Sequence, residues 1–596
     1  MRIRASYSIL FLLLLSACSE GIFKRNNANN SSSTPEAAYC AGTSTVSGSA
    51  TVITGTAQFQ RYDDGSSGLV STSTNNIRYA EVQILDASGN VIQCGETDSN
   101  GAIGSTADMG SGTHASPGLS IPRTAGTYTV KVNSRANNSF VKASILNNPT
   151  NNSYYSTLSS FSLTGVEATS AVTMTIAPYN GTLEGGAFNI LDQIVTINSY
   201  IRSNSTCAFC TTFTVAPKAS VYWTAGLSPG TYFGSPTTGI SFYNRYPSSG
   251  FPDALYILGG ISGSTCTDTD HFDNSVIIHE YGHFLENIIA QTDSPGGSHN
   301  GNQVIDPRLS WSEGFSDFIQ SKALSRNFYR DTVGNSACGN ASLAFSDFRL
   351  DMQVAGQDIP TNAGEGTFRE FATARALYSS TTSYGFQYIW SAFSDLTYGL
   401  KNSSFHFLNP GLFFKQFYYA INNRAALSTA AYTTNMSAEM EANNTLTYYA
   451  YPVTPRASSC HTTDSTYTFS TGVPVQQANS RYQNLSNRYL EYYFDGTSTD
   501  AILYLYYSPT TALYGPTPYD LDLIVYNEDY VYQDSSTVAG ISDNYYPESG
   551  GYEVVNLSGK PAGTYLINIA AYMSTASAKD TTRFYIQTNS GKYLCP

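Results

Sequence analysis

One segment, Val276–Leu285, constrains the fold more than any other, because it sets the pattern H-E-x-x-H inside an apolar run. Residues four apart lie on one face of a helix, so His279 and His283 can present imidazole nitrogens to a single metal ion. Glu280 is the candidate catalytic residue, a general base that takes a proton from a water at the metal. The pattern therefore predicts a helix that carries a zinc centre for hydrolysis.

Two simpler explanations of this pattern are chance and a pair of packed core histidines. With seven His in 596 residues, chance produces the pattern in roughly a few of every thousand such chains. The apolar flanks Val276–Ile278 and Phe284–Leu285 allow the helix to be buried on one side. Asp273–Ser275, just upstream, supplies residues that favour a helix start. The flanking sequence therefore favours the metal site over the packed histidines.

A catalytic zinc ion has three protein ligands and one open position, so a further ligand is required. Ser310–Ile319 has helical apolar spacing and sets Glu313 and Asp317 four residues apart, on one face. Glu313 is the candidate third ligand. A ligating histidine usually donates its second ring N–H to a carboxylate, and Asp317 is the candidate for that role. The alternative is a solvated acidic face.

The pattern H-E-x-x-H, followed on a later helix by E-x-x-x-D, resembles the gluzincin metallopeptidases, the thermolysin-like group. The residues that carry the resemblance are His279, Glu280, His283, Glu313 and Asp317. It covers roughly residues 185–450 and implies a zinc hydrolase with one Zn²⁺ per chain and a peptide or protein substrate. The interval between His283 and Glu313 is longer than in thermolysin, which leaves the shape of the cleft open.

The resemblance also implies a downstream histidine or tyrosine that holds the tetrahedral intermediate, and the sequence offers several candidates. They are His406 in an aromatic stretch, His299 in a Gly-rich loop, and Arg369, Arg375 and Tyr378 in a predicted amphipathic helix at 365–378. Each has a plainer explanation: a packed core histidine, an exposed loop residue or a solvated helix face. The sequence does not choose among them.

Upstream of the motif, residues 188–197 have helical periodicity, and residues 219–223 and 254–259 are strand-like runs rich in β-branched and aromatic residues. Gluzincins bind a peptide as an added strand along a sheet edge shortly before the site helix. Residues 254–259 occupy that place in order. The alternative is an ordinary interior strand.

The start of the chain resembles a bacterial lipoprotein signal. Two arginines precede an apolar run from Ile9 to Leu15, and Leu15-Ser16-Ala17-Cys18 follows. In such a signal the cysteine becomes the lipidated first residue of the mature chain, so Cys18 is the predicted membrane anchor. The alternative is a soluble secreted protein with an incidental cysteine. No later run approaches the roughly 18 apolar residues that a spanning helix needs.

Without Cys18 eight cysteines remain, an even number that favours disulfides in an exported chain. The simplest pairs are Cys40 with Cys94, Cys266 with Cys338, and Cys460 with Cys595. Cys207 and Cys210 form a single C-x-x-C. A local disulfide is the more frequent outcome for such a pair than a redox or metal centre.

Both flanks of the motif region alternate apolar and polar residues between turn signals, which predicts small β-sandwiches. The strand runs are 55–59, 80–86 and 125–132 before it, and 520–526 and 562–569 after it. The first region resembles transthyretin-like accessory domains, and the second resembles sandwich domains appended to bacterial secreted peptidases. Asp520 and Asp522 offer oxygen ligands for Ca²⁺, although aspartates at a strand start are more often simply exposed.

The expected fold class is multidomain, an α+β zincin-type metallopeptidase domain flanked by two all-β sandwich domains. The expected parts are a lipoprotein signal peptide at 1–17, a flexible tether at 18–45, an accessory sandwich at 46–180, the metallopeptidase domain at 181–455 and a C-terminal sandwich at 456–596. The length suits three or four domains. A net charge of −14 with only 12% charged residues argues against nucleic acid as a partner.

These observations together predict a zinc metallopeptidase that is lipid-anchored and extracytoplasmic in a bacterial cell envelope, at the outer membrane or cell surface. Its partners would be a peptide or protein substrate and the membrane. Two alternatives stay open. One is an adhesin-like surface lipoprotein that keeps a weak or inactive peptidase fold, and the other is a zinc hydrolase that acts on a non-peptide amide or ester.

Overall fold

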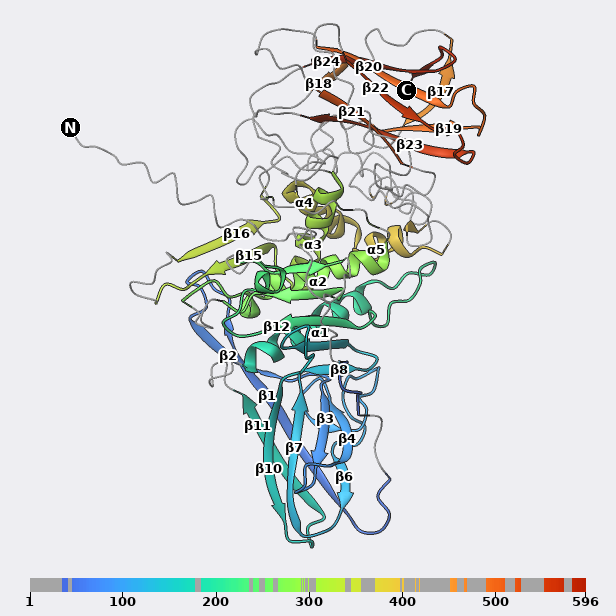
Figure 1. Ribbon diagram of the computed structural model, residues 1–596. Coiled ribbons are helices and arrows are strands. Elements are labelled where there is room, and N and C mark those ends of the chain that lie inside the picture. Colours follow the sequence, from blue (N-terminus) through green and yellow to red (C-terminus); the bar gives the residue numbers. More distant parts are fainter. Residues whose placement is uncertain are drawn as a thin grey trace, which may run out of the picture.

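The chain is multidomain and rich in β-structure. The computed structural model describes residues 35–40, 45–176, 184–234, 239–245, 252–260, 266–290, 292, 294, 299, 307–337, 345–354, 370–396, 399–400, 413, 417, 451–457, 466–468, 489–509, 520–526, 551–572 and 581–595. Figure 1 shows the N-terminal strands at one end, a layer of helices in the middle and the C-terminal strands at the other end. The expectation of several domains with many sheets is confirmed at this level.

The N-terminal strands form two sheets with a sandwich-like arrangement. One sheet contains β11 (Thr169–Ile176), β1 (Ala50–Asp63), β2 (Ser71–Asn76) and β6 (Leu119–Pro122). The other contains β10 (Ser156–Leu163), β7 (Gly126–Asn133), β3 (Glu81–Leu85), β4 (Val91–Thr97) and β5 (Ile103–Gly104). The strands predicted at 55–59, 80–86 and 125–132 are confirmed as β1, β3 and β7. Buried and exposed residues alternate along β11, as one-sided burial of a strand requires.

A third sheet joins the N-terminal strands to the helical layer. Its order is β13 (Phe242–Asn244), β14 (Ala254–Ile257), β12 (Ala219–Trp223), β9 (Lys142–Leu146) and β8 (Arg135–Asn137). The expected strands at 219–223 and 254–259 are confirmed as β12 and β14. Because β9 pairs with β12 in parallel, this sheet crosses the domain boundary expected at residue 180.

The position of β14 also decides one open question from the sequence. β14 pairs with β12 on one side and with β13 on the other, so it is an interior strand. A peptide cannot add to a strand whose two edges are already paired. The expectation of a substrate-binding edge at 254–259 is therefore wrong, and among the described strands of this sheet β13 takes the edge position next to it.

Five helices are present in the described part of the chain. They are α1 (Glu184–Asn204), α2 (Asn274–Ile289), α3 (Pro307–Ala323), α4 (Glu370–Tyr384) and α5 (Phe386–Ser394), with short 3-10 turns at Pro229–Phe233 and Asp270–Phe272. The helical periodicity predicted at 188–197, 276–285 and 310–319 is confirmed. One hydrophobic core runs from Ile53 on β1 to Phe417, so the N-terminal strands and the helices share it.

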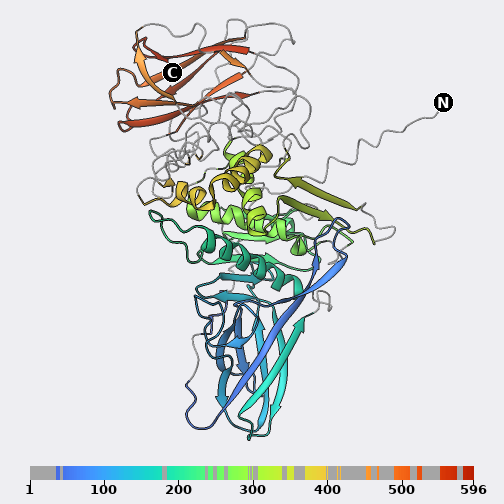
Figure 2. The same ribbon diagram turned by 180° about the vertical axis from the view of Figure 1, so that it is seen from behind.

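A hairpin follows α3 and lies beside the far end of β1. Its strands are β15 (Phe328–Val333) and β16 (Ser346–Asp351). The long strand β1 runs obliquely from the N-terminal sheets up to this hairpin, as Figure 2 shows from behind. Asp64, just after β1, forms an ion pair with Arg326, just before β15. This contact ties the N-terminal sheets to the helical layer at a second place.

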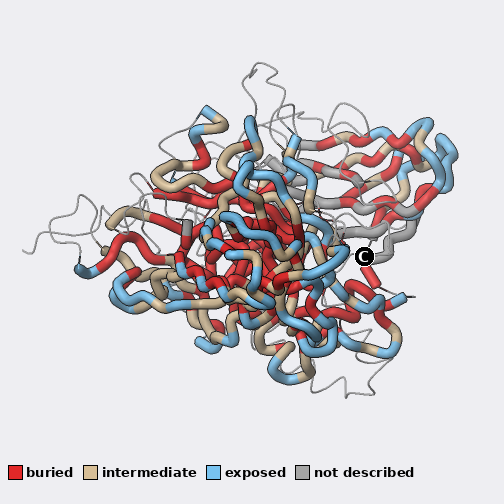
Figure 3. The backbone as a smooth tube through the Cα atoms, turned by 90° about the horizontal axis from the view of Figure 1, so that it is seen from below, coloured by how far each residue is buried: buried red, intermediate tan, exposed pale blue. Residues whose placement is uncertain are grey.

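Burial is concentrated where these layers meet. In the view from below, buried segments crowd the middle of the molecule and exposed turns surround them (Figure 3). The helix α2 lies inside this region, and most of its residues are buried. A helix that is buried on several sides has apolar residues around most of its circumference, and the consecutive apolar residues Val276–Ile278 agree with this. The motif helix is thus a central element of the fold.

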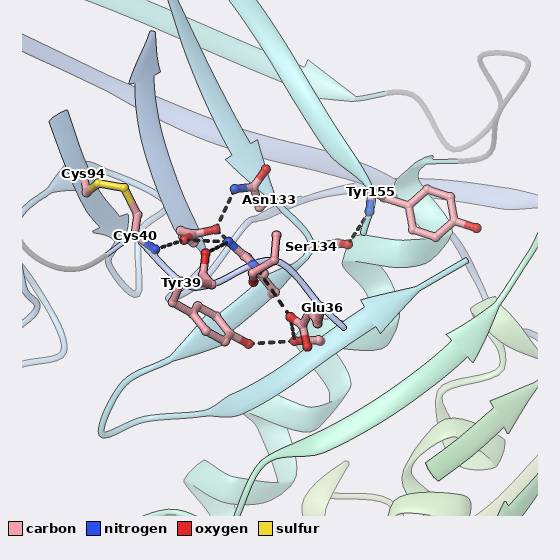
Figure 4. Close-up of polar contacts among 12 residues, drawn as sticks. Glu36, Tyr39, Cys40, Cys94, Asn133, Ser134 and Tyr155 are labelled. Carbon is pink, nitrogen blue, oxygen red and sulfur yellow. Dashed lines mark hydrogen bonds and ion pairs between the residues drawn. A yellow bond between two sulfur atoms is a disulfide. The ribbon is translucent and has the colours of Figure 1, made fainter. Parts of the chain in front are cut away.

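Part of the expected tether is held on the folded protein. Arg135, fully buried, donates to both carboxylate oxygens of Glu81, at 2.6 and 3.0 Å, and forms an ion pair with Glu36. The backbone N–H of Cys40 donates to Glu81 at 2.6 Å, and Cys40 forms a disulfide with Cys94 (Figure 4). Residues 35–40 are therefore fixed by a buried ion-pair network, in place of the flexible tether expected up to residue 45.

Two of the expected disulfides are present, and the other two involve residues outside the described part of the chain. The pairs Cys40–Cys94 and Cys207–Cys210 are confirmed. Cys266 is disulfide-bonded, and its expected partner, Cys338, lies outside the described residues. The side chains of the expected pair Cys460 and Cys595 and the predicted lipidation site Cys18 also lie outside the described part.

The C-terminal strands form one nine-stranded arrangement. Its main path is β21 (Asp520–Tyr526), β23 (Gly563–Tyr572), β19 (Tyr489–Phe494), β17 (Tyr451–Arg456), β25 (Tyr593–Cys595), β24 (Thr581–Thr588), β20 (Ile502–Pro509) and β22 (Gly551–Asn556), and β18 (Thr466–Thr468) pairs with β24. The strands predicted at 520–526 and 562–569 are confirmed. The side chains of Asp520 and Asp522 lie outside the described part, so the Ca²⁺ expectation there stays a prediction. Within the described residues, no helix has the length and apolar character needed to cross a membrane.

Candidate metal centre

The helix α2 begins at a residue that also anchors the neighbouring hairpin. Asp273 is its N-cap, one of the three residues expected at the helix start. The carboxylate of Asp273 makes no side-chain cap; it accepts hydrogen bonds from the backbone N–H of Thr332 at 3.1 Å and from its hydroxyl at 2.9 Å. Thr332 lies on β15. The start of the motif helix is therefore fixed by a buried contact to β15 as well as by its own apolar packing.

Three candidate ligands converge as the sequence predicts. The Nε2 atoms of His279 and His283 lie 3.1 and 3.2 Å from the same oxygen, Oε2 of Glu313. One ligand atom from each residue lies within 4.8 Å of the others, and all three residues are buried. Two imidazole nitrogens and one carboxylate oxygen form the donor set that suits zinc. The donor set thus fits the expected ion, with α2 and α3 each contributing to it.

The second ring nitrogen of His279 is held as expected. Its Nδ1 lies 2.9 Å from Oδ1 of Asp317, one turn beyond Glu313 on α3. A neutral imidazole that donates its Nδ1–H to this carboxylate leaves a lone pair on Nε2, the atom that faces Glu313. The E-x-x-x-D spacing therefore places one carboxylate beside the Nε2 atoms of both histidines and the other beside Nδ1 of His279.

The second histidine, His283, is oriented by a series of hydrogen bonds that the sequence did not predict. Nδ1 of His283 lies 3.0 Å from Oγ of Ser312 and 3.1 Å from Oγ of Ser316. The Ser312 hydroxyl in turn donates to Oε2 of Glu286 at 2.5 Å. A hydroxyl whose own hydrogen is engaged offers its lone pairs, so it can accept the Nδ1–H of His283. This leaves Nε2 of His283 as a lone-pair donor as well.

One residue of this hydrogen-bonded series, Glu286, could have been noticed in the sequence. Glu286 follows His283 by three residues on α2, between the apolar pairs Phe284–Leu285 and Ile288–Ile289, and it is fully buried. A carboxylate at a buried position of an apolar helix needs a partner, since an unpaired buried charge is costly. The partner, Ser312, lies on α3, and only the packing of α2 against α3 shows which serine it is.

Burial and neighbouring charge shift the pKa values of these groups in opposite directions. Burial alone would lower the pKa of His279, but its hydrogen bonds and charge interactions with Asp317 and Glu313 outweigh burial and raise that pKa well above its ordinary value. For Glu313, burial acts to raise the pKa, and the imidazoles of His283 and His299 outweigh it and lower that pKa. Burial raises the pKa of Asp317 to about 7. Positive charge on His279 and negative charge on Glu313 therefore stabilise each other.

The candidate catalytic residue, Glu280, is buried and adjoins a candidate ligand in the sequence. Glu280 lies on α2, directly after the first histidine, and none of its surface is exposed. Its negative charge contributes to a raised pKa of Asp270, for which burial is the largest cause. A carboxylate can accept a proton from water in hydrolysis of this kind, and Glu280 is the candidate for that role.

The candidates for the oxyanion-stabilising residue separate in the structure. His299 is buried, and its Nε2 lies 3.6 Å from Oε1 of Glu313 and 3.4 Å from Oε2 of Glu370. The exposed-loop alternative for His299 is therefore wrong. Arg375 is buried on α4, and Tyr378 is partly buried there. Arg369 and His406 lie outside the described residues.

Two glycines allow the helices of the site to approach closely. A Cβ atom on Gly282, between Glu280 and His283, would lie 2.8 Å from Oγ and 2.9 Å from Cα of Ser316 on α3. A Cβ on Gly314 would lie 2.6 Å from Cβ of Thr373 on α4. All three distances are too short for real contacts, so any larger residue would move the helices apart. No pattern in the sequence predicts this role.

A second group of carboxylates lies near the start of α2. Oxygens of Asp268, Asp270 and Asp331 lie within 4.8 Å of one another. Burial, followed by the charges of the other aspartates, raises the pKa values of Asp268 and Asp270 well above their ordinary value. Burial also raises the pKa of Asp331, on β15, to about 6. Crowded acidic side chains of this kind stay ionised only with difficulty.

No protein-family model matches this chain, and no curated protein matches it. The function is therefore inferred from the geometry of the site. This geometry comprises the three converging candidate ligands, His279, His283 and Glu313, and the partners that hold the other nitrogen of each histidine.

Proposed function

We propose that the chain is a zinc metallopeptidase of the gluzincin type. The observation that carries the proposal is the convergence of His279, His283 and Glu313 on one point, with both Nδ1 atoms hydrogen-bonded away from it. Such an arrangement fixes the tautomer of each histidine and presents two lone pairs and a carboxylate to one ion. Buried histidines need hydrogen-bond partners in any case, so the convergence of both Nε2 atoms on Oε2 of Glu313 is the more specific feature of this site.

Zinc, when bound by these three residues, supplies a Lewis acid that makes a water acidic and polarises a carbonyl. The remaining work belongs to the chain. Glu280 accepts a proton from the attacking water and passes it to the leaving amine, which requires a carboxylate that is ionised at the start. Asp317 and Ser312 hold the ring orientations of the two histidines. His299, close to both Glu313 and Glu370, is the nearest identified candidate for a contact with the substrate oxyanion.

The proposal extends to the organisation of the chain. Cys18 would carry lipid and anchor the protein to a membrane of the bacterial cell envelope, on its extracytoplasmic side. The N-terminal sheets would be a transthyretin-like accessory domain, and the C-terminal sheets would be a peptidase-associated sandwich. The contacts of residues 35–40 set an end to the proposed tether, because a tether that begins at Cys18 would reach the folded protein by Glu36.

The test is metal analysis of the purified mature chain, coupled to cleavage of a peptide library derived from a proteome. The proposal expects about one zinc per chain and cleavage that depends on it. Zinc-loaded protein that cleaves no peptide would favour the alternative, an adhesin-like surface lipoprotein with an inactive peptidase fold. Cleavage of an ester or a non-peptide amide alone would favour a zinc hydrolase of another substrate class.

A further inference from the structure

A polar cavity of about 390 Å³ lies where the N-terminal strands meet the helical layer. Its wall combines residues of β1 and β2 with residues of α1, the first residue of α2 and the chain just after α3. None of the proposed zinc ligands lines it. The volume lies within the roughly 300–1,000 Å³ range of small-molecule sites. The cavity is therefore separate from the proposed hydrolytic site and large enough for a small ligand.

Arginines outnumber acidic residues in the wall, in a chain whose net charge is −14. Arg61, Arg78 and Arg326 line the cavity, and Asp192 is the one acidic residue that lines it with them. Asp63 and Asp64, which pair with Arg61 and Arg326, do not line the cavity. These two arginines are thus held by carboxylates outside the wall. Such pairing orients a guanidinium before any ligand arrives, which reduces the entropy lost on binding.

Each of these three arginines has a nitrogen that makes no hydrogen bond to another described residue. Arg78 donates through Nε and Nη2, at 2.5 Å to Asp192 and 2.8 Å to Thr196, and its Nη1 has no hydrogen-bond partner among the described residues. Within the same described set, Nη2 of Arg61 and Nε of Arg326 also have none. The three side chains are 26%, 20% and 24% exposed respectively. Guanidinium N–H groups left free in a concave wall are suited to a carboxylate or phosphate.

The remaining wall is made mostly of neutral polar groups. Asn75, Asn76, Gln193 and Asn274 contribute amides, and Thr196 contributes a hydroxyl. Amide side chains both donate and accept, so they match hydroxyl or amide groups on a ligand. The apolar residues of the lining, Ala323 and Leu324, are few. This composition suits a small polar body and not a lipid or an aromatic compound.

We propose that this cavity binds a small polar molecule that carries a carboxylate or phosphate group. The arginines would bind the oxyanion, and the amides would bind the polar body. The ligand would contact Asn274, where α2 begins, and Leu324, where the chain leaves α3. Since α2 and α3 carry the proposed zinc ligands, binding here would stabilise the pair of helices. The site does not depend on catalysis at the metal centre.

The test is isothermal titration of the full mature chain with glucuronate, with inorganic phosphate and with glucose, in about 150 mM NaCl, where weak surface contacts are screened. Saturable binding of one molecule of glucuronate or phosphate per chain supports the proposal, and the probe that binds identifies a carboxylate or a phosphate ligand. Binding of neither at up to about 10 mM, or equal binding of glucose, would overturn it.

Variants place the binding in the cavity. Arg61→Gln should weaken binding at least about tenfold, because a charge-assisted hydrogen bond is lost. Asn75→Asp should do so as well by adding a negative charge to the wall, and it removes no ion pair that supports folding. Arg330→Gln is the matched control, since Arg330 pairs with Asp347 on the hairpin and does not line the cavity. Unchanged affinity in folded Arg61→Gln and Asn75→Asp would overturn the assignment, as would equal weakening in the control.

Discussion

The Nδ1 atom of His283 lies 3.0 Å from the hydroxyl oxygen of Ser312, which itself donates to Glu286 at 2.5 Å. The two histidines of the motif are therefore alike, because the Nδ1 atom of each is connected to a carboxylate by hydrogen bonds. The connection from His279 to Asp317 is direct. The connection from His283 to Glu286 passes through the hydroxyl of Ser312. The proposed metal ligands are therefore held by further residues on the same two helices.

Ser312→Ala should weaken zinc binding by roughly 10–100-fold, because of the two hydroxyls beside Nδ1 of His283 it removes the one that connects this atom to Glu286. Asp317→Asn should have a similar effect through His279. The measurement is a competition titration with a chromogenic zinc chelator. Ser310→Ala is the control, since Ser310 lies on the same helix and hydrogen-bonds to Thr373. Equal zinc affinity in Ser312→Ala and Ser310→Ala would contradict the orienting role.

Gly282→Ala should separate α2 from α3, because the new Cβ would lie 2.8 Å from Oγ of Ser316. Overpacking of this kind costs about 1–3 kcal/mol of the free energy of unfolding. Zinc affinity should fall too, since the ligands sit on both helices. Thermal unfolding and zinc titration check the two effects. Gly239→Ala, at a position with nothing within 4 Å of the added Cβ, should change neither.

The aspartates near the start of α2 should make the stability of chelator-treated protein depend on pH. Burial raises the pKa of Asp331 in the folded protein to about 6, above the unfolded value of about 3.9. The folded state therefore binds more protons between these values, and the contribution of Asp331 to stability falls as pH rises from about 4 to 6. The raised pKa values of Asp268 and Asp270 act in the same direction.

Asp331→Asn removes this charge permanently. Relative to wild type, the variant should gain stability as pH rises, by roughly 2 kcal/mol between about pH 4.5 and 7.5. The midpoint of thermal unfolding, followed by near-ultraviolet circular dichroism in excess chelator, measures the difference. A difference between the two proteins that stays constant with pH would show that Asp331 titrates normally.

Cys18→Ala should release the protein from the membrane fraction, because the proposed anchor is the lipid on this residue. Fractionation of cells and mass spectrometry of the mature N-terminus are the measurements. Wild-type protein should partition with membranes and carry acyl chains. A Cys18→Ala protein that fractionates and migrates like the wild type would rule out lipidation at this position.

The sequence predicted the parts of the site that follow from local spacing. A four-residue interval on a helix is enough to place His279 with His283, and Glu313 with Asp317, on shared faces. It also predicted the strands whose apolar and polar residues alternate, such as β7. Each of these features depends on residues that are close in the chain, and the structure confirms their placement.

What the sequence could not predict depends on partners far apart in the chain. The pairing of β9 with β12 joins residues 143–146 to residues 219–222, and no local pattern specifies that register. The interior position of β14 depends on β13, a strand of three residues. Ser312 and Gly282 look like ordinary small residues, and their roles appear only once α2 packs on α3.

Peptide hydrolysis by zinc-loaded Glu280→Gln protein, compared with zinc-loaded wild type, tests the central claim most directly. Glu280 is not a ligand in this account, so the variant should fold and hold about one zinc per chain. Its hydrolysis rate should fall by at least roughly 10²–10⁴-fold, because glutamine cannot accept the proton from water. A wild-type protein with full zinc that cleaves no peptide in a broad library, and is indistinguishable from Glu280→Gln, would contradict the account.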